Sequence, residues 1–202
     1  MMIPAVRGAI RALTLCALLM LAGCDGFSGW PAFQLTDLTG ADFGRDFSLT
    51  DHNGKPRTLA DFRGKVVAVF FGYTYCPDVC PTTMGEFALI MKELGRDAER
   101  VQVLFITVDP ERDTPALLSK YVPAFYPSFL GLYGDSDATT RTAKEFKVFF
   151  QKQKTEGGGY TVDHSAGTYI YDTAGRLRLF SAYGQGTQKA LHDIRLLLAA
   201  AP

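Results

Sequence analysis

Two cysteines lie where α/β chains often carry out chemistry. Cys76 and Cys80 follow an apolar run at residues 66–71, which is typical of a buried strand, and precede a helical pattern. Pro81 suits only the first turn of a helix, so we expect the helix to begin there, with Cys80 near its N-cap and Cys76 in the loop. The positive end of a helix dipole favours a thiolate. The sequence therefore predicts two reactive or metal-binding sulfurs; a pair of inert core cysteines is the alternative.

The spacing of these cysteines favours metal binding over ordinary disulfide exchange. Three residues separate Cys76 from Cys80, whereas thioredoxin-like redox motifs have two. The longer spacing lets the sulfurs spread around an ion. Thioredoxin-like oxidoreductases resemble one another in carrying a cis-proline before the strand that faces the thiols. Here residues 165–167 are Ser-Ala-Gly, so that feature of an oxidoreductase is missing.

His164 is the third candidate ligand, because its loop is expected to approach the cysteines. Two thiolates and one imidazole suit copper better than calcium or magnesium. Zinc accepts the same donors but normally takes a fourth ligand. The alternative is a partly buried structural histidine, although Asp163 offers His164 a neighbouring carboxylate. We expect His52, in a predicted turn exposed to solvent, and His192, on the last predicted helix, to have no ligand role.

The order of strand and helix patterns is that of a thioredoxin-like α/β fold. We expect one domain at residues 43–202, with a central mixed sheet flanked by helices and an N-terminal hairpin extension. Asp109 follows a predicted central strand, so it should lie beside the cysteine loop. The expected strands are residues 47–50, 57–59, 66–71, 101–108, 148–152, 160–163, 168–171 and 177–180, and the expected helices are residues 81–94, 115–122 (stopped by Pro123), 139–146 and 188–199.

The first residues are typical of a targeting segment and not of a folded element. Arg7 and Arg11 precede an apolar run at residues 12–20, and residues 21–24, LAGC, resemble the lipobox of bacterial lipoproteins. We therefore predict a lipoprotein signal peptide at residues 1–23. The apolar run is too short to span a membrane comfortably.

Cys24 would then carry a lipid at the new N-terminus, and residues 24–42 would form a tether with little structure. This predicts a protein held on the periplasmic side of the bacterial cell envelope and attached to the membrane by its lipid. Asp25 directly after Cys24 resembles the pattern of inner-membrane lipoproteins. Cys16 is removed with the signal peptide.

Charge excludes one class of partner. The chain has 21 basic and 21 acidic residues, and residues 1–23 include two basic and no acidic ones, so cleavage leaves 19 against 21. A slightly acidic protein argues against nucleic acid as a partner. Cleavage and lipidation leave Cys76 and Cys80 as the only free thiols, and in an oxidising compartment they could close a small redox disulfide.

Three segments together resemble the signature blocks of the Sco/SenC family. They are residues 75–81 (YCPDVCP), residues 108–115 (VDPERDTP) and residues 163–165 (DHS). The likeness extends over about residues 43–198, with the blocks in the family's order. Family members are often anchored by a transmembrane helix, whereas this sequence predicts a lipid.

The resemblance implies a thioredoxin-like fold and copper bound by Cys76, Cys80 and His164. It also implies a role in assembling the dinuclear copper centre of cytochrome c oxidase, whose copper-bearing subunit would be the partner. A periplasmic copper donor or thiol reductant is a further expected partner. Asp109 matches the family aspartate near the site, where it would support the ligands or face the partner; a plain loop-initiating role is the alternative.

Three functions remain open from the sequence. A copper chaperone would deliver Cu(I) or Cu(II), a thiol-disulfide reductase would keep the acceptor's cysteines reduced, and a copper or redox sensor would signal through a partner. Only the reductase would be an enzyme, and no residue is assigned as catalytic. A peroxidase is disfavoured, because position 73 is Tyr where the peroxiredoxin pattern has threonine.

Overall fold

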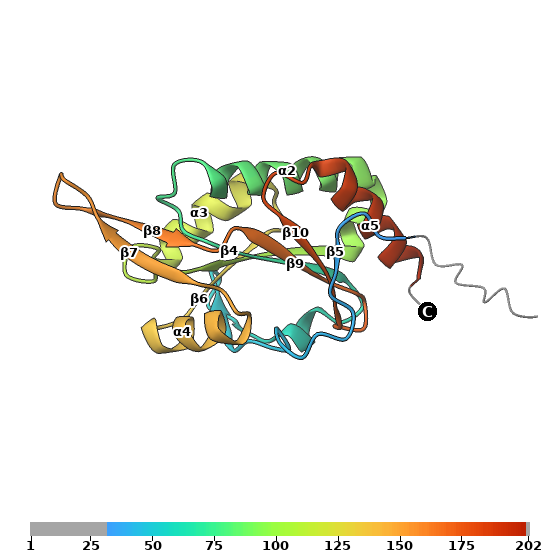
Figure 1. Cartoon of the computed structure of the whole chain (residues 1–202), viewed down its shortest axis with the longest axis horizontal. Coiled ribbons are helices and arrows are strands. Elements are labelled where there is room, and N and C mark those ends of the chain that lie inside the picture. Colours follow the sequence, from blue (N-terminus) through green and yellow to red (C-terminus); the bar gives the residue numbers. More distant parts are fainter. Residues whose placement is uncertain (1–31, 201–202) are drawn as a thin grey trace, which may run out of the picture. The chain divides into compact units, whose positions relative to one another are not determined.

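The computed structural model describes residues 32–200 (Figure 1). The predictions for residues 1–23, for Cys24 and for the first part of the tether lie outside the described residues. From Phe33 onward the described residues form one compact unit.

A mixed sheet of eight strands forms the centre of this unit, in the order β1-β10-β9-β4-β5-β6-β2-β3. Its middle strands β4 (Val66–Gly72) and β5 (Val101–Thr107) are parallel, and every residue of both is buried. Runs of Val, Phe, Leu and Ile form such strands because both faces lie against other layers. The predicted α/β fold with a central mixed sheet is confirmed.

Shorter strands extend the sheet on both sides of this centre. Strand β9 is antiparallel to β4, β10 to β9, and the hairpin of β2 and β3 extends the far edge beyond β6, as the predicted N-terminal extension. The bounds of the outer strands are β1 (Thr36–Asp37), β2 (Leu49–Asp51), β3 (Pro56–Arg57), β6 (Leu130–Tyr133), β9 (Gly167–Tyr171) and β10 (Leu177–Ala182). Short 3-10 helices η1 (Leu59–Phe62) and η2 (Gly95–Arg100) precede β4 and β5.

Helices cover the sheet from two sides (Figure 1). Helices α2 (Val79–Leu94), α3 (Pro115–Phe125) and α5 (Thr187–Ala199) lie on one side, where α2 packs on both α5 and α3. Helix α4 (Ser136–Glu145) lies on the other side. The predicted flanking helices are therefore present.

Helix α2 begins two residues earlier than the sequence predicts. Asp78 is its N-cap, Val79 its first residue and Pro81 its third. The N–H groups of the first turn have no partner within the helix, so proline is tolerated beyond the first position. Cys80 therefore lies inside the first turn and not at the N-cap.

Two further predictions differ from the structure. Pro123 lies within α3, near its end, and the helix continues to Phe125. The edge-on contact of the Tyr121 and Phe125 rings, 5.2 Å apart, favours this last turn. Strand β6 (Leu130–Tyr133) has no counterpart among the expected strands, because four residues that include a glycine give little indication of a strand. It forms because it pairs with β5 on one side and β2 on the other.

The tether predicted at residues 24–42 has structure near its end. Thr36 and Asp37 form β1, paired with β10, and Leu35 is buried. The backbone N–H groups of Gln34 and Leu35 both donate to the Asp193 carboxylate on α5. The expectation of little structure is therefore wrong for this part of the segment.

Strands β7 (Phe150–Lys154) and β8 (Tyr160–His164) pair only with each other, so they form a separate two-stranded hairpin. Figure 1 shows this hairpin extending away from the main sheet. Four of the five residues of β7 are exposed. His164 is the last residue of β8, opposite Phe150, and not part of a loop as predicted.

Candidate metal centre

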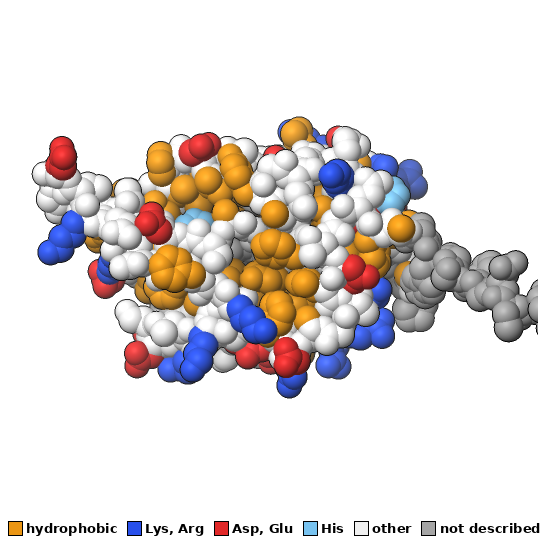
Figure 2. All heavy atoms as spheres, viewed as in Figure 1, with side chains coloured by type: hydrophobic (Ala, Val, Ile, Leu, Met, Phe, Trp, Pro, Cys, Tyr) orange, Lys and Arg blue, Asp and Glu red, His pale blue; other side chains and the backbone are white. Residues whose placement is uncertain are grey.

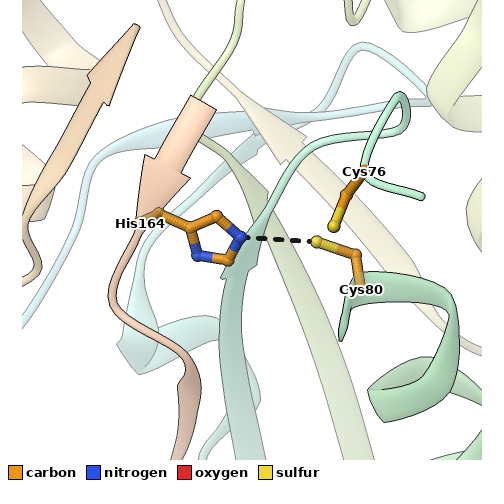
Figure 3. A group of neighbouring side chains, drawn as sticks. All are labelled: Cys76, Cys80 and His164. Atoms are coloured by element: carbon orange, nitrogen blue, oxygen red, sulfur yellow. Dashed lines mark hydrogen bonds between the residues drawn. The ribbon is translucent and has the colours of Figure 1, made fainter. Parts of the chain in front are cut away.

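The structure brings the three predicted ligand residues together (Figure 3). The ligand atoms of Cys76, Cys80 and His164 all lie within 4.8 Å of one another. The Cys80 Sγ atom is 3.5 Å from His164 Nε2. The cysteines come from the junction of β4 and α2 and the histidine from the end of β8, so two segments distant in the sequence meet at one point.

Gly72, at the end of β4, leaves the space that Cys80 occupies. A Cβ atom at position 72 would lie 2.9 Å from Cys80 Sγ, 2.8 Å from the Phe70 ring and 2.9 Å from the Phe105 ring. Side chains in a packed core have no room for such an addition. The buried sulfur is therefore seated directly against the backbone of the central strand.

Asp113 holds the cysteine loop in place. Its buried carboxylate accepts hydrogen bonds from Thr74 Oγ1 at 2.6 Å, from Thr74 N–H and from Thr107 Oγ1 at 2.6 Å. Burial raises the pKa of Asp113, although these hydrogen bonds oppose the change. The contact ties the loop before Cys76 to the loop after β5.

The two thiols differ in exposure. Cys76 is partly exposed, whereas Cys80 is fully buried, and neither is in a disulfide. Burial raises the pKa of Cys80 well above its usual range. A hydrogen bond with the Tyr73 backbone lowers this pKa, but by less than burial raises it. Burial thus opposes the thiolate that the sequence predicts for Cys80 at this helix terminus. A metal ion would have to displace the proton of this thiol.

His164 is oriented with one ring nitrogen toward the sulfurs. Its Nδ1 lies 3.0 Å from the Ser165 carbonyl, which can only accept a hydrogen bond, so Nδ1 carries the proton. The Nε2 lone pair then faces the Cys80 thiol and accepts its hydrogen bond. Burial lowers the pKa of His164, so the ring stays neutral at neutral pH. The Phe70 and Tyr73 rings contact it edge-on, at 6.3 Å and 5.9 Å between ring centroids.

Asp109 lies beside this cluster but is not among its ligand atoms. Its side chain is fully buried and accepts hydrogen bonds from Arg112 Nε and from Tyr160 Oη, the latter at 2.8 Å. The carboxylate thus supports neighbouring side chains and has no exposed surface with which to face a partner. Arg112, Asp113 and Tyr160 were not expected at the site; the only signal for the first two was their place in the segment at residues 108–115.

The donor set determines what this centre could hold. Two thiols and an imidazole form the only group of three or more His, Cys, Asp or Glu side chains with metal-ligand spacing among residues 32–200. No fourth such donor completes a closed tetrahedron in that part of the chain, which zinc sites normally require. The arrangement suits a soft ion that accepts three ligands, such as Cu(I).

Comparison with known families now adds to this geometry. Residues 36–199 match the SCO1/SenC family. The chain belongs to this family. The match includes both cysteines, the histidine and the loop with Asp109, so the family resemblance inferred from the three signature segments is confirmed.

Members of the SCO1/SenC family that resemble this chain come from bacteria and eukaryotes. The mouse protein named "Protein SCO2 homolog, mitochondrial" is 37% identical over 158 residues, which are 77% of this chain and 62% of the mouse protein. This chain thus spans about three fifths of that relative's length.

Two solved structures of Sco proteins share the fold. Apo Sco1 from Thermus thermophilus is 42% identical, with a TM-score of 0.74, covering 83% of this chain and 98% of that one. Bradyrhizobium japonicum ScoI, solved with copper bound, is 40% identical, with a TM-score of 0.70, covering 76% and 98%. These likenesses confirm the predicted thioredoxin-like fold.

The other two histidines of this SCO1/SenC chain have structural contacts. His52 lies in a turn, as predicted, but it is half-buried and not fully exposed. Its ring Nδ1 accepts a hydrogen bond from the Gly131 backbone N–H at 3.0 Å, and the His52 backbone N–H donates to the Gly131 carbonyl. His192 contacts the Asp193 carboxylate at 2.8 Å. In residues 32–200 neither belongs to a group with metal-ligand spacing, and no helix there has the length and apolar character needed to cross a membrane.

Proposed function

We propose that this SCO1/SenC protein is a copper chaperone that delivers copper to the copper-bearing subunit of cytochrome c oxidase during assembly. The convergence of Cys76, Cys80 and His164 within 4.8 Å carries the proposal. The donor types match copper, and the related Bradyrhizobium structure is one with copper bound.

Uptake begins with the reduced thiols. Copper replaces the protons of both thiols, which pass to solvent, and takes the place of the Cys80 hydrogen bond at the lone pair of His164 Nε2. The neutral imidazole needs no deprotonation, because its single proton lies on Nδ1. The copper ion is cargo here, so a centre that is too closed would retain it.

Delivery proceeds by ligand exchange from the exposed side. Cys76 is partly exposed and Cys80 is fully buried, so a cysteine of the acceptor replaces Cys76 first. Each new acceptor–copper bond replaces one chaperone–copper bond, and each released sulfur takes up the proton that the acceptor thiol gives up. Copper keeps its oxidation state throughout.

Exposed apolar side chains flank this entry route. Tyr75 is next to Cys76 and is 59% exposed. Phe149 is also 59% exposed and precedes Phe150, the residue that pairs with His164 in the hairpin. Figure 2 shows hydrophobic side chains gathered over the middle of one face, with charged side chains of both signs mostly around its edges. Such a surface suits a protein partner better than nucleic acid.

The lipobox-like residues 21–24 support the location that this role requires. A signal peptide at residues 1–23 and a lipid on Cys24 would place the protein on the periplasmic side of the cell envelope, held at the inner membrane. Mass spectrometry of the membrane-extracted protein tests this: a mature chain that begins at Cys24 and carries lipid mass is expected.

Copper binding is tested by titrating the reduced, full-length chain in detergent with Cu(I) against a competing chelator, without oxygen. We expect one copper per chain, and a loss of affinity of about tenfold or more in His164→Ala, because a three-coordinate ion loses one donor. Equal affinities for the parent and His164→Ala would contradict the three-ligand site.

Thiol-disulfide reduction is the second candidate, favoured by two unpaired cysteines whose sulfurs lie in the same small cluster. The Cys76 thiolate would attack an acceptor disulfide, and Cys80 would then displace the reduced acceptor and leave a Cys76–Cys80 disulfide. This activity would survive in His164→Ala, whereas copper delivery would not. Assays of both reactions on that variant therefore separate the two functions.

A further inference from the structure

The loop at residues 109–113, between β5 and α3, contacts both segments that carry the metal ligands. We infer that Arg112 in this loop is a positioning residue, which holds the His164 hairpin against the cysteine loop and so sets the affinity of the site for copper. The inference rests on the proposed function, because it concerns the same three ligands.

Arg112 holds the hairpin at its first β8 residue. Its Nη1 donates to the Tyr160 carbonyl at 2.9 Å, and its guanidinium carbon lies 3.7 Å from the centre of the Tyr160 ring. Tyr160 Oη donates to Asp109, the same carboxylate that accepts from Arg112 Nε. Tyr160 and His164 are the two ends of β8, so a contact at one end constrains the ligand at the other.

The hairpin depends on contacts with the rest of the domain, among them the buried Val162 side chain and the Arg112 link. Strands β7 and β8 pair only with each other, and a two-stranded hairpin is marginally stable by itself in water. A second link, the ion pair of Lys152 with Glu111 at 2.6 Å, is exposed on both sides and contributes little. The buried Asp109 carboxylate makes the Arg112 link the stronger one.

The same guanidinium contacts the cysteine loop. It lies 4.8 Å from the centre of the Tyr75 ring and 5.7 Å from that of Tyr73, on either side of Thr74. Thr74 is itself bound by Asp113, the residue after Arg112. The loop at residues 109–113 thus contacts the cysteine loop through Asp113 and through the stacking of Arg112 on the tyrosine rings. It contacts the histidine hairpin through Arg112 and Asp109.

Arginine is suited to this position in a way that lysine is not. Its planar group stacks on aromatic rings while separate nitrogens donate to Asp109 and to the Tyr160 carbonyl. Its side chain is only 24% exposed, and its Nη2 is buried without a hydrogen-bond partner in the described part of the chain. Arg112 is therefore directed into the molecule and not toward a docking protein.

A double-mutant cycle on copper affinity tests the inference. Four full-length, reduced proteins in detergent are titrated with Cu(I): the parent, Arg112→Gln, His164→Ala and the double variant. We expect Arg112→Gln to lower affinity about tenfold in the parent but less than about twofold when His164 is absent, because it acts through that ligand. Equal losses in both backgrounds, or no loss in the parent, would overturn the inference. If His164→Ala alone has no effect, the proposed three-ligand site fails instead.

A metal-free measurement keeps the inference testable if Arg112→Gln folds poorly. Arg112→Lys retains the charge beside Asp109 and loses the stacking and the forked donors. We expect amide hydrogen exchange in β8 of this variant to become about tenfold faster while exchange in α5 stays unchanged. The matched control is Arg176→Gln, which removes the ion pair of an exposed arginine with Asp172 away from the site. Asp172 is buried but keeps its contact with Arg178, so neither β8 exchange nor copper affinity should change. Unchanged exchange in β8 of Arg112→Lys would contradict the anchoring role.

Discussion

At the scale of single residues, the centre depends on how tightly Cys80 is enclosed. Its sulfur is fully buried against the end of β4, where position 72 has no side chain. The geometry of the ligand set thus depends on Gly72, which is not itself a ligand.

Gly72→Ala should therefore damage the centre. The added methyl would overlap Cys80 Sγ and two phenylalanine rings, so we expect about 1–3 kcal/mol loss of folding stability and weaker Cu(I) binding. Chemical denaturation and chelator competition measure the two effects. Gly85→Ala is the control, because no atom lies within 4 Å of its added Cβ and alanine favours a helix. Normal copper affinity in Gly72→Ala would show that the sulfur can move without consequence.

The buried Cys80 thiol also predicts a pH dependence of copper uptake. Burial raises the pKa of Cys80, so this thiol is protonated in the metal-free protein at neutral pH and must lose its proton when copper binds. The apparent affinity should then rise with pH between about 6 and 8, by about tenfold per pH unit for each proton displaced. Titrations across this range in buffers that do not bind copper, together with direct measurement of released protons, check it. An affinity that does not change with pH would mean that neither thiol loses a proton when copper binds.

At the scale of elements, the hairpin of β2 and β3 closes around one buried carboxylate. Asp51 accepts hydrogen bonds from Arg57 Nε at 2.8 Å and from two backbone N–H groups in the turn, those of Asn53 and Lys55. Burial raises the pKa of Asp51, but these donors and the charge of Arg57 outweigh burial and hold the pKa below its usual value.

Asp51→Asn should destabilise the fold by about 1–3 kcal/mol at neutral pH, because the charge-assisted bonds are lost. The folded-state pKa is lowered, so this stabilisation is present above the unfolded pKa near 4 and disappears as pH falls through the folded value. Denaturation curves of the parent and variant should thus differ at pH 7, and the difference should shrink as the pH falls below about 4. A difference that does not shrink in acid would show that the effect does not come from the charge.

At the scale of the whole molecule, the chain entering the domain is fastened at a distance from the metal centre. Gln34 and Leu35 donate backbone hydrogen bonds to the buried Asp193 on α5, and β1 adds a strand beside β10. The compact unit therefore starts earlier than the first predicted strand.

Two shortened chains test where the folded unit begins. A chain that starts at residue 33 should keep the stability of the parent, because it retains the whole unit Phe33–Pro202. A chain that starts at residue 39 loses β1, the buried Leu35 side chain and two donors to Asp193, so we expect about 2–4 kcal/mol lower stability. Thermal and chemical unfolding of both chains measure the difference. Equal stabilities would show that residues 33–38 are not part of the cooperative unit.

Much of this protein could be predicted from local patterns in its sequence. Apolar runs predicted the central strands, and Gly95 with φ 59° ends α2 where expected. The residue types of Cys76, Cys80 and His164 indicate a soft-metal donor set through the chemistry of their side chains alone. These signals are local, because strand burial, helix ends and donor chemistry depend on a few neighbouring residues.

Other features follow from contacts between distant segments. Strand β6 forms because β5 and β2 pair with it, and β1 forms because β10 does. Burial raises the pKa of Cys80, an effect that the helix-terminus argument could not include. The joint role of Asp109, Arg112 and Tyr160 appears only when the hairpin and the loop meet, about fifty residues apart in the chain. The sequence by itself determined which atoms could bind a metal; the tertiary structure decided how they are held, because packing between distant segments sets both solvent exposure and geometry.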